Sequence, residues 1–288
     1  MRWGLLINPT SGGGRGEKVG IQVRQWLDRN QIEIIDLSGS SYESAQSNLR
    51  QQNLSDLHGV IAVGGDGLVH CVIQQLAKSS TPLAVVPGGT GNDFARALGL
   101  PLDQPEKILT KVMNSPAVPI DLGKVGDQYF AAILSTGFDS VVNERANRMR
   151  RIKGRLKYNI SILLELPLFQ PRRYQFQIDG EGFTTEAMLI AIGNGSSYGG
   201  GMLVCPGANL HDGSFEVMIL QPVSKMEFLR VFPKVFSGAH INHPKVKILH
   251  GSSIEMESDA VAYADGERIG PLPIQATTIA DALLTWKF

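Results

Sequence analysis

Residues 60–67, Val-Ile-Ala-Val-Gly-Gly-Asp-Gly, decide the fold. A short apolar run that ends in glycine predicts a buried strand, and the helical spacing of apolar residues beyond it predicts a helix over 69–77. Predicted strands and helices alternate in the same way before and after this stretch. A strand predicted over 3–8 precedes a helix over 17–29, and a strand predicted over 83–86 ends in Pro-Gly-Gly. This alternation indicates an α/β fold with a mostly parallel sheet and helices on both faces.

Beyond about residue 122 the pattern changes to strands that come in pairs with turns between them. This favours a C-terminal antiparallel β-sandwich or flattened barrel. We therefore expect a three-layer nucleotide-binding domain over 1–122 and a β-rich domain over 123–288, whose last strand packs back on the first domain. The predicted strands of the second part are 173–178, 183–192, 214–221, 246–249, 253–257, 261–269 and 277–288, with helical segments over 139–166 and 225–237.

The composition is that of a globular protein without covalent staples. Of 288 residues, 43% are hydrophobic and 19% charged, and the formal net charge of zero argues against a nucleic-acid partner. Cys71 and Cys205 form no CxxC spacing, which favours a reducing compartment and two buried thiols. The apolar N-terminal run is too short for a signal peptide or a membrane span. We expect a cytoplasmic protein that contacts membranes transiently.

Three glycine-rich loops follow predicted strands at one edge of the sheet. Glycine lets the backbone approach phosphate oxygens and direct N–H groups at them, and ligands of such sheets bind beyond the carboxyl ends of the strands. The first loop contains no Walker A register, and Glu17 breaks a GxGxxG pattern. In the second loop, the carboxylate of Asp66 between glycines suits Mg2+ or a nucleotide. The loops are Asn8-Pro9-Thr10-Ser11-Gly12-Gly13-Gly14-Arg15-Gly16, Gly64-Gly65-Asp66-Gly67 and Pro87-Gly88-Gly89-Thr90-Gly91-Asn92-Asp93.

The motifs NPTSGGG, VGGDG and PGGTGNDFARALGLP together resemble the diacylglycerol kinase catalytic-domain family, which includes bacterial lipid kinases and the sphingosine and ceramide kinases. The resemblance runs along the whole chain. It implies an ATP- and Mg2+-dependent kinase that phosphorylates a hydroxyl of a diacylglycerol-like or sphingoid lipid. Further downstream it includes Ser135-Thr136-Gly137-Phe138-Asp139, Ala191-Ile192-Gly193-Asn194, Pro206-Gly207-Ala208 and Asp265-Gly266-Glu267.

The resemblance also implies roles for particular residues. Glu267 matches the general base, and Asp66 is the second candidate catalytic residue, beside the metal and nucleotide. Transfer is then expected in a cleft between the domains. The expected metal site is Asn209, Asp212 and Ser214, with Asp212 as the carboxylate, and its role, structural or catalytic, stays open. The expected nucleotide contacts are Asn8, Pro9, Thr10, Ser11, Gly12, Gly64, Gly65, Asp66, Gly67, Gly89, Thr90, Asn92 and Asp93.

One departure from the family pattern keeps other functions open. Leu68 replaces a threonine, and His70-Cys71 replaces an Asn-Glu pair, so that a hydroxyl and a carboxylate near the nucleotide are lost. The nucleotide preference is therefore uncertain. The alternatives are an NAD kinase-type enzyme, which shares the GGDG loop, and a lipid-binding pseudokinase without turnover.

A membrane contact is expected from a basic segment over 145–157 that precedes an apolar one over 158–168. Basic residues beside apolar ones suit an anionic bilayer surface, although a solvated helix face followed by a core helix would show the same pattern. The sequence leaves a homodimer open and does not identify the lipid.

Overall fold

The computed structural model describes residues 2–149 and 155–288. The chain divides into two compact units. Unit 1 comprises Met1–Leu122 and Ile279–Phe288, and unit 2 comprises Gly123–Thr278. The mixed α/β class, with a parallel-rich sheet first and an antiparallel sandwich second, is confirmed.

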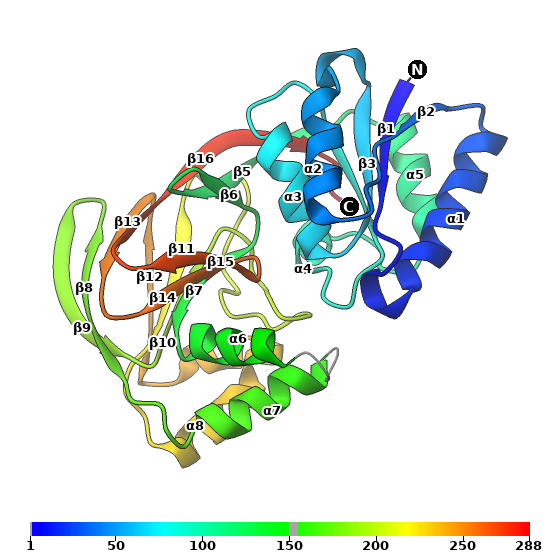
Figure 1. Cartoon of the computed structure of the whole chain (residues 1–288). Helices are drawn as coiled ribbons and strands as arrows, with labels where there is room; N and C mark the ends of the chain where they lie inside the picture. The colour runs from blue at the N-terminus through cyan, green and yellow to red at the C-terminus, as the bar shows by residue number, and fades with distance from the viewer. Residues whose placement is uncertain (1, 150–154) are drawn as a thin grey trace. The chain divides into compact units, whose positions relative to one another are not determined.

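Unit 1 is a parallel sheet between two helical layers, and its strand order is β2-β1-β3-β4-β16. Helices α1 and α5 cover one face, and α2 and α3 cover the other (Figure 1). The strands are β1 (Arg2–Ile7), β2 (Glu33–Asp36), β3 (Gly59–Gly64), β4 (Leu83–Pro87) and the end of β16 (Ile274–Thr285). The helices are α1 (Arg15–Arg29), α2 (Tyr42–Gln51), α3 (Asp66–Leu76), α4 (Asp93–Ala97) and α5 (Pro105–Asn114), with 3-10 turns at Ser11–Gly13 and Leu54–Asp56.

The central strands of unit 1 are apolar throughout because helices cover both faces of the sheet. Every residue of β3 and β4 is buried. Helix α1 buries Val19, Val23 and Leu27, which lie four residues apart on one side. The C-terminal strand belongs to the same core, since Trp286 packs 6.0 Å from Trp3 and its indole N–H donates to the Ser115 carbonyl at 2.8 Å.

Unit 2 is a sandwich of two antiparallel sheets. One sheet contains β8 (Arg172–Ile178), β9 (Glu181–Ala187), β13 (Ser253–Glu257) and the beginning of β16. The other has the order β12-β11-β10-β7-β14-β15. Its strands are β7 (Ile133–Gly137), β10 (Leu189–Gly193), β11 (Phe215–Leu220), β12 (Val246–Gly251), β14 (Val261–Ala264) and β15 (Glu267–Pro271). Strand β5 (Val118–Val125) pairs with β16 and with the short strand β6 (Gln128–Phe130), outside this second sheet.

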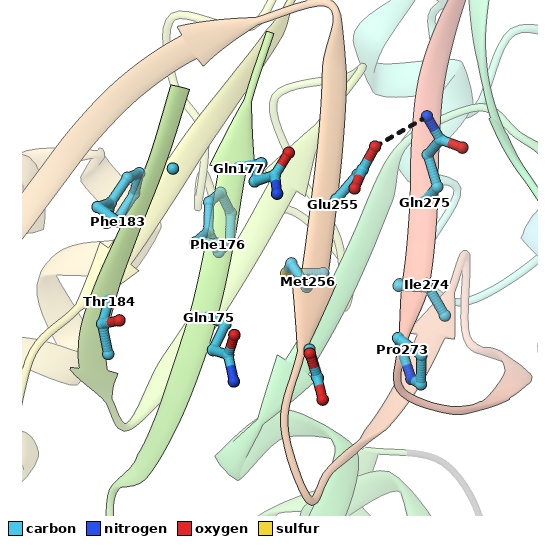
Figure 2. Close-up of a pocket in the computed structure, with 12 residues that line it drawn as sticks. Gln175, Phe176, Gln177, Phe183, Thr184, Glu255, Met256, Pro273, Ile274 and Gln275 are labelled. Atoms are coloured by element: carbon cyan, nitrogen blue, oxygen red, sulfur yellow. Dashed lines mark hydrogen bonds between the residues drawn. The ribbon is translucent and has the colours of Figure 1, made fainter. Parts of the chain in front are cut away.

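The outer face of the first sheet carries a hollow of about 610 Å³ (Figure 2). Gln175 and Gln177 of β8, Glu255 of β13 and Gln275 of β16 line it, and Gln275 donates to Glu255 at 3.4 Å. Glutamine and glutamate side chains give this face a polar and acidic character. It contains none of the residues that the sequence predicts for the site.

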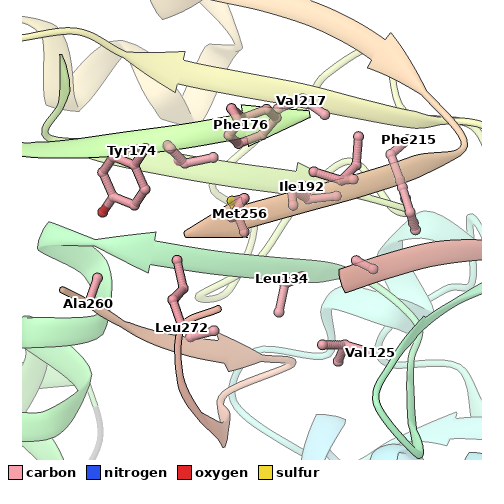
Figure 3. Packing of buried hydrophobic residues seen from close by; sticks show 14 of the residues in the cluster. Val125, Leu134, Tyr174, Phe176, Ile192, Phe215, Val217, Met256, Ala260 and Leu272 are labelled. Carbon is pink, nitrogen blue, oxygen red and sulfur yellow. The ribbon is translucent and has the colours of Figure 1, made fainter. Parts of the chain in front are cut away.

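The inner faces of the two sheets form the main core of unit 2 (Figure 3). Phe130 and Phe215 stack at 5.7 Å, and Tyr174, Phe176 and Met256 are buried beside them. A second core lies between the other face of the second sheet and helices α6 (Phe138–Arg148), α7 (Arg155–Glu165) and α8 (Lys225–Val231). Two short 3-10 segments, Phe232–Ser237 and Ala239–Asn242, follow α8.

Three predicted elements were wrong in their extent. The strand predicted over 183–192 is two strands in different sheets, because the chain changes sheet at Met188, whose N–H donates to the Leu220 carbonyl. The strand predicted over 261–269 is the hairpin β14–β15, which turns at Asp265 and Gly266, both with positive φ. The helix predicted over 225–237 ends at Val231 and continues as a 3-10 segment containing Pro233.

Candidate functional site

The three glycine-rich loops of unit 1 lie backbone against backbone. A Cβ atom built on Gly89 would lie 2.5 Å from the Gly65 Cα, and one built on Gly12 would lie 2.6 Å from the Gly88 carbonyl oxygen. A Cβ on Gly16 would lie 2.1 Å from the Asn8 carbonyl oxygen. Any side chain at these positions would push the loops apart. The glycines therefore serve the close packing of the loops.

Side chains brace the third loop and join it to the second. Asn92, at the start of α4, accepts from the Gly89 N–H at 2.8 Å and donates to the Gly89 carbonyl at 2.9 Å. Its positive φ of 54° is a conformation that asparagine tolerates well. The Asp66 Oδ1 accepts from the Phe94 N–H at 3.2 Å, so this carboxylate connects the second loop to α4. Gly88 donates to the Gly64 carbonyl at 2.7 Å, which extends the β3–β4 pairing into the loops.

The first loop is held by its own asparagine. The Asn8 Oδ1 accepts from the Thr10 N–H at 3.2 Å and from the Thr10 hydroxyl at 2.9 Å. The Asn8 N–H donates to the Val63 carbonyl at 2.9 Å, so the loop begins beside the end of β3. Helix α1 follows it, and the N-terminal end of a helix carries partial positive charge that favours anions.

The predicted nucleotide residues thus gather at one edge of the unit 1 sheet, and they differ in exposure. Asn92 and Asp93 are buried, Asp66 is partly buried, and Thr90 is exposed. Pro9, Thr10, Gly12 and Gly67 are also exposed. The buried members shape the loops, and the exposed backbone and hydroxyls of the remaining members are accessible to a phosphate chain.

The residues that depart from the family pattern have a packing role. Leu68 is buried over Gly64, where a built Cβ would lie 2.9 Å from the Leu68 Cδ2. His70 is buried in α3, and the Gln74 side chain donates to its carbonyl at 3.1 Å. The Cys71 thiol contacts the Tyr42 carbonyl of α2 at 4.0 Å, and burial raises its pKa to about 11. Cys71 is therefore protonated at neutral pH and belongs to the α2–α3 contact.

In unit 2, the Asp-Gly-Glu segment is the turn of the β14–β15 hairpin. The Asp265 carboxylate accepts from the backbone N–H groups of Ala131, Ala132 and Ile133 at 2.7, 2.9 and 3.2 Å. This fixes the turn against the start of β7. Glu267, the first residue of β15, has an exposed side chain. A rigid turn with an exposed carboxylate suits a group that must accept a proton from a bound molecule.

The strand that carries Glu267 is also tied to helix α6. Arg268 donates to Glu144 at 2.7 Å, and the Tyr263 hydroxyl donates to the same carboxylate at 3.0 Å. The hydrogen bond from Arg268 lowers the pKa of Glu144, although partial burial opposes this. These contacts hold α6 against the β14–β15 hairpin.

Unit 2 contains a second acidic group, Asp139, to which sequence reasoning gave no role. Asp139, at the start of α6, accepts from the Ser135 hydroxyl and from the Tyr198 hydroxyl at 3.1 Å, and burial raises its pKa. The pKa of Tyr158 is raised by burial and then by the charges of Asp139 and Glu267. The feature of the sequence that could have indicated Asp139 is the Ser135–Asp139 motif, in which a serine and an aspartate four residues apart meet at a strand-to-helix junction.

The predicted metal residues lie in the loop before β11. The Asp212 Oδ1 accepts from the Ser214 N–H at 3.1 Å, Gly213 has a φ of 66°, and Asn209 and Asp212 are exposed. Among the described residues, no group of three or more histidine, cysteine, aspartate or glutamate side chains could hold a metal ion. Mg2+ keeps several waters and binds through one or two carboxylates, so an oxygen set of Asp212 with backbone carbonyls fits its chemistry.

Family comparisons agree with this organisation of the chain. Residues 2–125 match the diacylglycerol kinase catalytic domain, and residues 132–285 match the domain described as "YegS C-terminal NAD kinase beta sandwich-like domain". A diacylglycerol kinase from Mycobacterium tuberculosis is 35% identical over 285 residues, which is 96% of this chain and 92% of that protein. A diacylglycerol kinase from Bacillus subtilis is 31% identical over 274 residues, which is 93% of this chain and 90% of that protein.

Solved structures show the same fold at lower sequence identity. A diacylglycerol kinase from Bacillus anthracis str. Sterne has a TM-score of 0.75 and 21% identity, covering 100% of this chain and 97% of that chain. An NAD kinase from Archaeoglobus fulgidus in complex with ATP has a TM-score of 0.57 and 14% identity, covering 100% and 94%. The fold and the loops define a nucleotide-binding α/β unit followed by a β-sandwich. The chain belongs to the diacylglycerol kinase family, whose members are lipid kinases.

Proposed function

We propose that this protein transfers the terminal phosphate of ATP to a hydroxyl of a diacylglycerol-like or sphingoid lipid. The observation that carries the proposal is the contact of three glycine-rich loops at one edge of the unit 1 sheet, with Gly89 too close to Gly65 for any side chain. Phosphoryl transfer depends on positioning and on charge neutralisation more than on covalent chemistry by the protein. Closely packed loops with exposed backbone supply rigid N–H donors for that task. Relatives at 31–35% identity carry the name diacylglycerol kinase.

The roles follow from the position of each group. Backbone N–H groups of the loops bind the phosphates, and Thr90 offers an exposed hydroxyl to the nucleotide. Asp66 and Asp93 are the carboxylates next to those loops and would orient a nucleotide-bound Mg2+, which supplies charge neutralisation when bound. Asp212 would hold a second, separate ion with backbone carbonyls.

Glu267 of unit 2 is proposed as the general base that takes the proton from the lipid hydroxyl. Its side chain is exposed, and the adjoining Asp265 holds the turn with three backbone hydrogen bonds. The proposed partners are the lipid acceptor and, peripherally, an anionic membrane surface. The basic segment over 145–157 supports that contact in sequence, although Arg150, Arg151 and Lys153 lie outside the described residues.

An acceptor panel tests the proposal. The full chain is incubated with γ-labelled ATP and Mg2+ and with diacylglycerol, a sphingoid base, ceramide or NAD, each in separate reactions. Label in a lipid hydroxyl supports the proposal and identifies the lipid. Label only in NAD would show an NAD kinase-type enzyme instead. ATP binding without label in any acceptor would leave a binding protein without turnover.

A further inference from the structure

The exposed apolar side chains of this protein concentrate on two segments of unit 2. Of the twelve exposed large hydrophobic residues found among residues 2–149 and 155–288, six lie on the end of α7 and the turn after it, or on α8 and the 3-10 segment after it. They are Leu163, Leu164, Leu168, Met226, Leu229 and Phe236, and the most exposed, Leu168, has 74% of its surface accessible. Isolated exposed apolar residues are ordinary, but a group of this size marks an interaction surface.

The two segments are neighbours in space. The Phe138 ring packs edge-on against Phe169, which follows α7, at 5.2 Å and against Phe228 of α8 at 5.0 Å. The Lys225 ammonium, at the start of α8, donates to the Phe169 carbonyl. Figure 1 shows α7 and α8 side by side within unit 2. The six residues therefore belong to one region, which we call the α7–α8 apolar surface.

Charges around this surface favour an anionic partner. Arg230 and Lys234, between Leu229 and Phe236, are exposed. The two acids of the same segments have internal partners. Glu165 pairs with Arg145 of α6. Glu227 caps α8 through the Ser224 N–H at 3.4 Å and lies 3.2 Å from His243.

We propose that the α7–α8 apolar surface docks into the interfacial layer of a bilayer that contains anionic phospholipid. This rests on the proposed function, because a kinase whose acceptor carries acyl chains must meet that acceptor where it resides. Helices with apolar residues on one face and basic residues beside them bind in this way, with their apolar side chains about 5–10 Å into the headgroup region. Each nearby basic residue strengthens attraction to an anionic leaflet.

The arrangement of apolar and basic side chains suits the interfacial layer of a bilayer. On α8 and the 3-10 segment after it, Arg230 and Lys234 lie between Leu229 and Phe236 in sequence, so apolar burial and anion contact would occur at the same time. Among the described residues, no helix has the length and apolar character needed to cross a bilayer. Docking through side chains on the surface is the form of membrane contact that these elements can provide.

Vesicle flotation of the full chain tests the proposal. The test variant replaces Leu163, Leu168, Met226 and Phe236 with serine, because these are the most exposed members and contribute least to the cores beneath them. The matched control is Ile21→Ser on α1 of unit 1, where an apolar side chain is 51% exposed outside the surface. Vesicles contain phosphatidylglycerol with phosphatidylcholine, or phosphatidylcholine alone.

We expect the wild type and Ile21→Ser to bind phosphatidylglycerol vesicles alike, and the fourfold variant to bind at least tenfold more weakly. Turnover on a short-chain, water-soluble diacylglycerol should stay within twofold in all three proteins. Equal vesicle binding by the fourfold variant would overturn the docking surface. If the wild type is a dimer and the fourfold variant is a monomer with unchanged vesicle binding, the docking proposal is wrong and the surface is a contact between two copies of this chain. Wild-type vesicle binding without phosphorylation of any lipid would refute the proposed function and leave the surface standing.

Discussion

Replacement of Gly89 by alanine should separate the packed loops of unit 1. The added Cβ would lie 2.5 Å from the Gly65 Cα and 2.9 Å from the Asn92 Oδ1. Carbon atoms in contact prefer about 3.5–4.0 Å, so the third loop must move by roughly 1 Å relative to the second. The same movement would weaken the two hydrogen bonds between Asn92 and Gly89. Overpacking of this kind costs about 1–3 kcal/mol of stability.

The larger expected effect is on ATP. Hydrogen bonds to charged groups contribute about 1.5–3 kcal/mol each, and about 1.4 kcal/mol corresponds to a tenfold change in affinity. Displacement of one loop from its phosphate should therefore weaken ATP binding by at least about tenfold, measured by titration calorimetry with Mg2+ present. Gly182→Ala is the control, because its Cβ would meet Gln177 at an ordinary 3.7 Å. Gly89→Ala protein that melts cooperatively and binds ATP within twofold of wild type would refute the assignment of these loops.

Other substitutions and conditions test other parts of the structure. Asp66→Asn keeps an acceptor for the Phe94 N–H but removes the charge. The variant should therefore fold normally and lose Mg2+-dependent ATP affinity, and unchanged affinity would exclude Asp66 as a metal-orienting group. Burial raises the pKa of both thiols, so Cys71 and Cys205 should react with a thiol reagent only on unfolding, and rapid labelling of the native protein would contradict their packing. The Ser253 N–H and the Ser252 hydroxyl lower the pKa of Asp179, so its stabilising contribution is present above its unfolded pKa and is lost as pH falls through the lower folded value. Asp179→Asn should therefore make the free energy of unfolding less sensitive to pH in the acid range, by less than about 1 kcal/mol because the group is so exposed. The melting temperature measured against pH checks this, and a profile identical to that of the wild type would show that these hydrogen bonds do not act on stability.

The sequence predicts the nucleotide edge of unit 1 well because local and global requirements coincide there. A buried strand such as β3 must be apolar on both faces, and the turn after it must contain glycine where two backbones meet. The position of Asp66 and Asn92 beside that edge follows from the strand order. Their particular hydrogen bonds do not, because either side chain could equally have faced solvent.

The strand pairing of unit 2 is harder to predict from the sequence, because it depends on contacts between segments that are far apart in the chain. Nothing local at Met188 separates β9 from β10, and the chain changes sheet there because each strand finds a different partner. The Asp265 carboxylate binds three N–H groups more than 130 residues earlier in the chain, which no local pattern shows. Leu68 and Cys71 differ from the family pattern in sequence, and only their packing against Gly64 and α2 shows what they do instead.

The most direct test of the account compares wild type with Glu267→Gln for phosphate transfer to diacylglycerol in mixed micelles, with labelled ATP and Mg2+. Glu267 is exposed at the start of β15, so the isosteric change should leave the fold and the ATP affinity intact. Loss of a positioned general base lowers rates by about 10²–10⁴-fold, so we predict label in the lipid with wild type and a loss of that size in the variant. A variant that keeps more than half of the wild-type rate would contradict the role of Glu267. Wild-type protein that binds ATP but labels no lipid would contradict the assignment as a lipid kinase.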